Sequence, residues 1–139
     1  MSSPSSKSIL VVEDDDTLNG LLVGQLRRMG YEATGARSMA EARALVRAGQ
    51  PDLALLDSRL PDSDGTESIV WLREHCPVIV LTAFGSVELA VQAVQAGASD
   101  YLTKPVSPGR LEIAVRRAFE TDELRRKVEF LETRARVRP

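Results

Sequence analysis

Three acidic residues follow two apolar runs that have the length and composition of buried strands. Glu13 and Asp14 come directly after the run at 9–12, and Asp57 ends the run at 53–56. In an open parallel sheet ligands bind beyond the carboxyl ends of the strands, so the three carboxylates should converge if these strands are neighbours. Converging carboxylates repel one another unless a cation lies between them, and a hard divalent cation such as Mg²⁺ prefers oxygen ligands. The sequence therefore predicts a Mg²⁺ site at Glu13, Asp14 and Asp57.

A hydroxyl and an ammonium follow two further apolar runs. Thr82 comes after Val78–Leu81, and Lys104 comes after Tyr101–Thr103. At the same sheet edge they would complete a site for phosphoryl transfer, in which a carboxylate such as Asp57 acts as a nucleophile and becomes an aspartyl-phosphate. A metal would screen the phosphoryl oxygens and Lys104 would add a positive charge, while the Thr82 hydroxyl could hydrogen-bond one phosphoryl oxygen.

Five expected strands alternate with five expected helices along the chain. The strands are expected at Ile9–Val12, Glu32–Ala36, Leu53–Leu56, Val78–Leu81 and Tyr101–Thr103. This alternation predicts an α/β fold with a parallel sheet covered by helices on both faces and joined by right-handed crossovers. The flavodoxin-like doubly wound (βα)5 three-layer sandwich, with strand order 2-1-3-4-5, puts the first and third strands side by side. The acidic residues meet in that order.

The expected helices carry apolar residues at helical spacing. In the first helix these are Leu18, Leu21, Leu22, Leu26 and Met29, and in the third helix, Thr66–Glu74, they are Ile69, Val70 and Leu72. Gly30 and Gly97 are expected to end the first and fourth helices.

Length and composition indicate one soluble globular domain, because 43% of the 139 residues are hydrophobic and 27% are charged. The net charge of −2 offers no basic field for DNA or RNA, and no apolar stretch is long enough to span a bilayer. The single cysteine, Cys76, cannot form an internal disulfide, which favours a reducing cytoplasm. Residues 1–7 are rich in serine and lack the apolar core of a signal peptide, so we expect a disordered tail there.

At successive strand ends and in this order, the motifs resemble a receiver domain of a two-component response regulator. The matching segments are Ile9–Asp14, Asp57–Gly65, Val78–Ala83 and Ala96–Pro105. The resemblance extends over most of the chain. We therefore divide the chain into a receiver domain at 8–120 and a helical extension or linker at 121–139.

The resemblance implies a phosphoacceptor and a set of metal ligands. Asp57 matches the phosphoacceptor, and a sensor histidine kinase would be the phosphodonor. Asp57 and Asp14 match direct Mg²⁺ ligands, and Glu13 matches the acid that reaches the metal through water. Arg59 would contribute its backbone carbonyl to the metal.

Three further residues match the rest of the family's pocket. Lys104 matches the pocket lysine, and its peptide bond to the following proline is expected to be cis. Thr82 and Tyr101 match the hydroxyl and the aromatic side chain that move on phosphorylation and reshape the face of the fourth helix, fifth strand and last helix. The chain departs from the pattern in having glutamate at position 13 and a short Thr66–Pro77 segment, which predicts a trimmed third helix or following loop.

Each of these residues also has a plainer interpretation. Asp57 could be a turn or cap residue, Lys104 a solvated lysine, Thr82 a strand former and Tyr101 an edge-packing residue. Asp15 and Asp16 fit helix caps better than metal ligands, Asp62 and Asp64 fit loop positions, and His75 fits an exposed histidine better than a phosphodonor.

The alternative function is a Mg²⁺-dependent phosphohydrolase that also uses an aspartate nucleophile. An enzyme of that kind and similar fold would usually carry a general-acid aspartate two residues after the nucleophile, where this chain has Arg59. It would also need a substrate-specific cap, for which the sequence offers no insertion. We therefore favour a phosphoacceptor signalling domain over an enzyme.

The C-terminal segment continues the last expected helix, which begins near Ser107. Leu111, Ala114, Val115, Ala118 and Phe119 suit packing on the sheet, and Leu124, Val128, Leu131 and Ala135 form a seam typical of a short coiled coil. Together with Thr82–Glu88, this helix resembles the receivers of NtrC-type activators, where it leads to an ATPase and a DNA-binding module. The chain could be an excised receiver, a single-domain regulator or a receiver from a hybrid kinase, and the linker-like segment Asp122–Arg138 favours excision. We also expect a homodimer that uses this seam; the alternative is a solvated helix extension.

Overall fold

The computed structural model describes residues 6–63, 66–83 and 85–137. Most of the expected tail at 1–7 therefore lies outside the described residues, as do Asp64, Gly65 and Phe84. Among the described residues, no helix is both long and apolar enough to cross a membrane.

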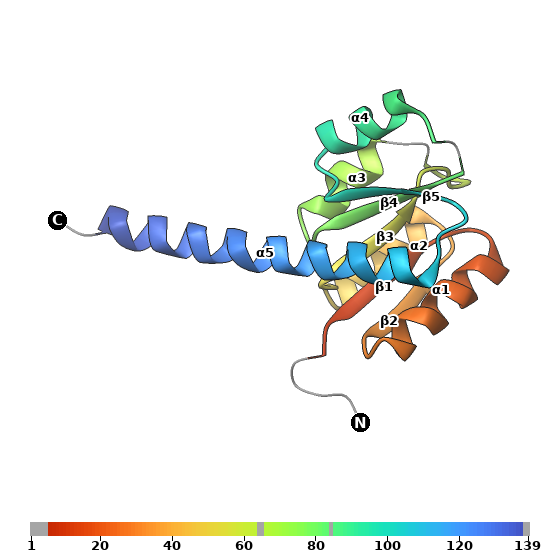
Figure 1. The fold of residues 1–139 in the computed structure, drawn as a ribbon, viewed down its shortest axis with the longest axis horizontal. Helices are drawn as coiled ribbons and strands as arrows, with labels where there is room; N and C mark the ends of the chain where they lie inside the picture. Colours follow the sequence, from red (N-terminus) through yellow and green to blue (C-terminus); the bar gives the residue numbers. More distant parts are fainter. Residues whose placement is uncertain (1–5, 64–65, 84, 138–139) are drawn as a thin grey trace.

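Five parallel strands form one sheet in the order β2-β1-β3-β4-β5, as predicted (Figure 1). The strands are β1 (Ser8–Val12), β2 (Glu32–Ala36), β3 (Leu53–Asp57), β4 (Val78–Thr82) and β5 (Asp100–Thr103). Val12 of β1 pairs with Leu56 of β3, and Asp57 pairs with Leu81 of β4. The carboxyl ends of β1, β3 and β4 therefore lie next to one another.

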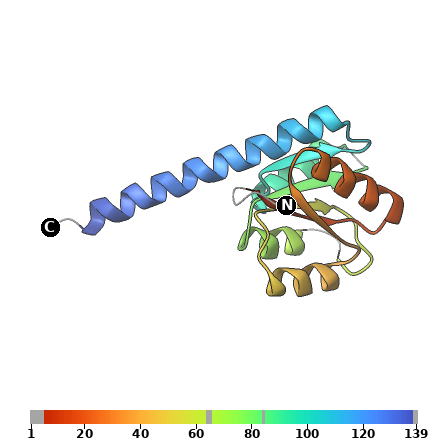
Figure 2. The ribbon, with the colours of Figure 1, turned by 90° about the horizontal axis from the view of Figure 1, so that it is seen from below.

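Helices cover both faces of the sheet. They are α1 (Asp16–Arg28), α2 (Met39–Ala48), α3 (Thr66–Arg73), α4 (Val87–Gln95) and α5 (Pro108–Val137). Figure 2 shows α1 and α5 on one side of the sheet and α2 and α3 on the other. Alternate residues of each central strand point to opposite faces, so two apolar clusters form: Leu55 and Ile79 pack toward α1 and α5, whereas Leu56 and Val80 pack toward α2, α3 and α4. This is the predicted three-layer sandwich.

Local signals set the helix ends. The Asp15 side chain accepts a hydrogen bond from the Leu18 N–H at 2.9 Å and caps α1, which confirms its interpretation as a cap. Gly30 and Gly97 have φ of 98° and 105°, a conformation that favours glycine, and they follow α1 and α4 as predicted. These helix-ending residues keep the connections between helices and strands short.

Two residues of the apolar helix patterns do not pack on the sheet. Leu21 of α1 and Val70 of α3 are exposed, although both belong to the apolar residues that recur at helical spacing. Each lies beside the residues that do pack, Leu22 in α1 and Ile69 in α3, so the apolar stripe is wider than the contact face. The third helix is short, as predicted, and ends at Arg73.

The last helix has two parts. Leu111, Ala114, Val115 and Ala118 are buried against the sheet, which confirms the predicted packing face. Beyond Asp122 the same helix continues away from the sandwich toward the C-terminus (Figure 1).

Candidate functional site

The predicted acidic residues converge at the carboxyl edge of the sheet. Carboxylate oxygens of Glu13, Asp14 and Asp57 all lie within 4.8 Å of one another. Glu13 is only 1% exposed and Asp57 is buried, whereas Asp14 is exposed. Two acids held out of water beside a third create a strongly negative site, which requires a positive partner.

Lys104 is that partner. Its Nζ lies 2.6 Å from Glu13 Oε1 and 3.4 Å from Asp57 Oδ2. The Lys104–Pro105 peptide bond is cis, as predicted, and the Lys104 backbone N–H donates to the Thr82 carbonyl at 2.7 Å. Burial by itself would lower the pKa of Lys104, but the hydrogen bond with Glu13 and the charge of Asp57 outweigh it, so the pKa lies above its ordinary value. The site therefore contains a permanent cation.

Backbone donors hold the two buried carboxylates. The Arg59 N–H donates to Asp57 Oδ1 at 3.1 Å, while Oδ2 of the same group faces Lys104. The Asp15 N–H donates to Glu13 Oε2 at 3.2 Å, while Oε1 faces Lys104. Each carboxylate therefore has one oxygen on the lysine and one on the main chain.

Comparison with known proteins identifies this arrangement. A sequence profile described as the response regulator receiver domain matches residues 9–116. The chain belongs to this family. Among the curated relatives, the response regulator protein PilR of Pseudomonas aeruginosa is 40% identical over 118 residues, which are 83% of this chain and 26% of PilR. The nitrogen assimilation regulatory protein NtrX of Azorhizobium caulinodans is 40% identical over 128 residues, 88% of this chain and 28% of NtrX.

Solved receiver structures have the same fold. NtrX of Brucella abortus superposes with a TM-score of 0.85 at 32% identity, covering 96% of this chain and 30% of that one. A CheY-like receiver domain protein of Methanospirillum hungatei has a TM-score of 0.80 at 33% identity, covering 87% of this chain and 99% of that one. The receiver therefore matches nearly the whole of one solved chain. It spans about a quarter of the length of PilR and of the curated NtrX.

The acidic pocket of this receiver fits a hard divalent cation. Three carboxylates meet there and one ammonium offsets part of their charge, so a net negative, all-oxygen donor set remains. Receiver domains bind Mg²⁺ at such a pocket. Thr82 is fully buried at the end of β4, and Tyr101 of β5 is half-buried against the cluster on the α2, α3 and α4 side.

Two polar residues make contacts that the sequence does not predict, although Asp62 lies in a loop as expected. Asp62 accepts hydrogen bonds from the Met39 and Ala40 N–H groups at 2.9 and 3.0 Å, and these bonds lower the pKa of its carboxyl. The loop after β3 is thereby tied to the start of α2. Asn19 of α1 is buried and hydrogen-bonds main-chain carbonyls at the ends of β1 and β2. A polar residue on the inner face of a helix was the only available signal for Asn19.

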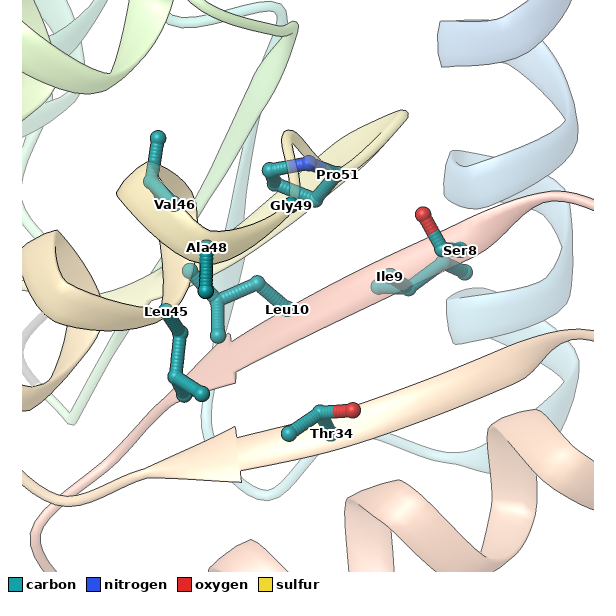
Figure 3. A pocket seen from close by; sticks show the side chains of 9 residues that line it. All are labelled: Ser8, Ile9, Leu10, Thr34, Leu45, Val46, Ala48, Gly49 and Pro51. Atoms are coloured by element: carbon teal, nitrogen blue, oxygen red, sulfur yellow. The ribbon is translucent and has the colours of Figure 1, made fainter.

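Other polar residues that the sequence raised lie outside the pocket. Asp16 is the first residue of α1 and pairs with Arg37 on the surface, so the cap is Asp15 and not Asp16. The His75 ring packs on Trp71 and is half-buried, not exposed as expected. A separate cavity of about 290 Å³ lies between β1, β2 and the end of α2. Figure 3 shows the side chains that line it. Leu10, Leu45 and Val46 line it, and no ionisable side chain does, so it offers no group for phosphoryl chemistry.

Proposed function

We propose that Asp57 accepts a phosphoryl group from a phosphohistidine of a partner sensor kinase in a Mg²⁺-dependent reaction. The observation that carries this is the meeting of Asp57 with Glu13, Asp14 and Lys104 at one sheet edge. An oxygen of Asp57 attacks phosphorus, the new O–P bond replaces the N–P bond, and the electron pair of that bond leaves with the kinase imidazole. The product is an aspartyl-phosphate on β3.

The pocket residues would have separate roles, as metal ligands or as a positive charge. Asp14 and Asp57 would bind Mg²⁺ directly, Glu13 would act through water, and the backbone carbonyl of Arg59 would complete the protein ligands. When bound, the ion would neutralise the charge of the phosphoryl oxygens, which the acidic pocket would otherwise repel. Lys104 provides the second positive charge, for which its raised pKa keeps it protonated.

Phosphorylation would act on the rest of the receiver through Thr82 and Tyr101. The Thr82 hydroxyl would bond one phosphoryl oxygen, and Tyr101 would then repack against the α3 and α4 side of the sheet. This shifts the population between two existing arrangements of α4, β5 and α5. The exposed apolar residues Val87, Val91 and Val94 of α4 lie on the face that changes, and they suit a contact with a second receiver. The output would be transcription control by the rest of a longer protein.

We further infer that the receiver modifies only itself. Arg59 stands where a phosphohydrolase of similar fold would carry its general acid. The receiver should therefore be phosphorylated once and lose the group slowly, without steady turnover of phosphoesters.

Intact mass spectrometry after incubation with acetyl phosphate tests the assignment. With Mg²⁺ the wild type should gain the mass of one phosphoryl group, and with a chelator it should gain none. Asp57→Asn should remain unmodified, because an amide cannot attack phosphorus. Asp16→Asn is the matched control, since Asp16 is an exposed acid near the same edge and pairs with Arg37. Equal modification of Asp57→Asn and wild type would overturn the proposal.

A further inference from the structure

Asn19 has its side-chain amide buried at the junction of β1, β2 and α1. The residue is 8% exposed. Its Nδ2 lies 2.9 Å from the Glu13 carbonyl oxygen, 3.0 Å from that of Ala36 and 3.5 Å from that of Val11. Carbonyl oxygens only accept hydrogen bonds, so the NH₂ group of the amide must face them. The orientation of the amide is therefore fixed by its neighbours.

Gly35 of β2 leaves room for the other side of the same amide. A Cβ at position 35 would overlap Asn19 Oδ1 and approach its Cγ to 3.0 Å. Among the described glycines only Gly30 and Gly97 have positive φ, so the backbone of Gly35 would accept alanine. The three atoms nearest to that Cβ all belong to Asn19, so Asn19 is what requires glycine at position 35.

The hydrogen bond to Glu13 reaches the acidic pocket through one rigid unit. The Glu13 carbonyl belongs to the peptide plane that leads into Asp14. The Glu13 N–H donates to the Ala36 carbonyl at 2.9 Å, so both peptide planes flanking Glu13 are held at the end of β2. Fixing these planes sets the direction in which Glu13 and Asp14 leave β1, and hence where their carboxylates lie.

We propose that Asn19 is a positioning residue for the metal site and that Gly35 is the space it needs. The inference rests on the proposed function, since it assigns Asn19 to the Mg²⁺ site of that reaction. Asn19 touches neither the ion nor the phosphoryl group. It acts by holding the Glu13–Asp14 peptide in the orientation that brings both acids toward Asp57.

Divalent-ion affinity of the folded protein separates this role from a purely structural one. Mn²⁺ is the probe, because the spectroscopic signal of the free ion reports binding directly. Asn19→Ala should weaken binding roughly tenfold or more, the loss typical when a group supporting metal ligands is removed. Gly20→Ala is the matched control, because it lies next to Asn19 in α1 and nothing stands within 4 Å of the added Cβ. It should leave the affinity unchanged.

Gly35→Ala is a second variant that tests the same role without removing a buried polar group, so a folding defect from that removal cannot explain its result. Its added methyl displaces the Asn19 amide, so it should weaken Mn²⁺ binding about as much as Asn19→Ala does. In the double variant Asn19→Ala/Gly35→Ala the methyl has room, and the loss should equal that of Asn19→Ala alone. Urea midpoints, measured in parallel, establish that every titration is made on folded protein.

The outcomes distinguish this inference from the function on which it rests. Wild-type affinity in both Asn19→Ala and Gly35→Ala would overturn the positioning role and leave Asp57 as acceptor. Additive losses in the double variant would overturn the link between Gly35 and Asn19. A wild type that binds Mn²⁺, with weakened variants, but gains no phosphoryl group from acetyl phosphate would support the positioning role and overturn the proposed function.

Discussion

The first part of α5 packs against the sheet, whereas the part after Asp122 extends beyond it (Figure 1). Apolar residues recur at helical spacing in both parts. Those of the first part, such as Leu111 and Val115, are fully buried, and those of the second part, such as Leu124 and Leu131, are exposed. The same pattern therefore has two meanings: a helix face that the fold has already covered, and one that only another surface can cover.

The two parts also differ in what stabilises them. Burial of apolar area stabilises the first part. In the second part the interactions are ion pairs along the helix: Asp122 with Arg125 at 2.9 Å and with Arg126 at 3.0 Å. Asp122 is 10% exposed and the two arginines are 61% and 63% exposed, so these pairs lie at the start of the extension and do not support its far end. A second surface that covers the exposed seam would bury the apolar area that the single chain leaves in water.

Truncating one leucine in each part should give the largest contrast. Leu111→Ala should lower the free energy of unfolding by about 2–5 kcal/mol, because it leaves a cavity in the core. Leu124→Ala should change it by no more than about 0.5 kcal/mol, because the side chain is exposed and alanine favours a helix. Urea unfolding of both variants at low protein concentration measures the difference. Similar losses would mean that the extension packs on the receiver.

A charge on the seam should weaken self-association by at least about tenfold, because it would be buried without a partner. Leu131→Asp is the test and Phe130→Asp its matched control. The two neighbours are 62% and 61% exposed in the single chain, but Phe130 lies about a third of a turn from the seam. Sedimentation equilibrium should show a weaker dimer for Leu131→Asp than for Phe130→Asp. Identical association of both with wild type would make the extension a solvated helix.

The smallest expected effect concerns Cys76, which is buried beside Ala118 and Asp122, where the two parts of α5 meet. Burial, with the charges of Asp52 and Asp122, raises the pKa of its thiol to about 12. The protonated thiol is favoured in the folded state, so its stabilisation is complete below about pH 9 and is lost as the pH rises toward about 12.

The urea midpoint of the wild type should therefore fall more between neutral pH and about pH 10 than that of Cys76→Ala. Comparing the two proteins cancels the titration of lysines and tyrosines. Equal falls would show that the thiol is not held away from water at this junction.

The sequence predicted the strand order and the pocket because both follow from short patterns. Runs such as Val78–Leu81 are buried on both faces, and residues that follow them, such as Asp57 and Lys104, must gather at one edge. The contacts of Asn19 and Asp62 could not be predicted in this way. Their partners, Ala36 and Met39, lie 17 and 23 residues away, and only the folded chain brings these groups together.

Burial within helices was predicted less well than the pocket. Leu21 and Leu22 are adjacent apolar residues, and only one of them faces the sheet. Periodicity gives the direction of a helix face, but its width depends on the neighbouring elements. The seam shows the same limit, because spacing alone does not say whether Leu124 and Leu131 meet a partner.

Because α5 is one continuous helix, a tilt of its packed part also moves its C-terminal end. No break separates the residues that pack beside β4 and β5 from the residues near Val137. From Asp122 to Val137 the helix measures about 24 Å, so a tilt of about 10° at the sheet would move its tip by about 4 Å. A small tilt of the packed part of α5 could thus bring two extensions into register or separate them. The extension would then turn a small shift of the helix at the sheet into a larger displacement at its far end.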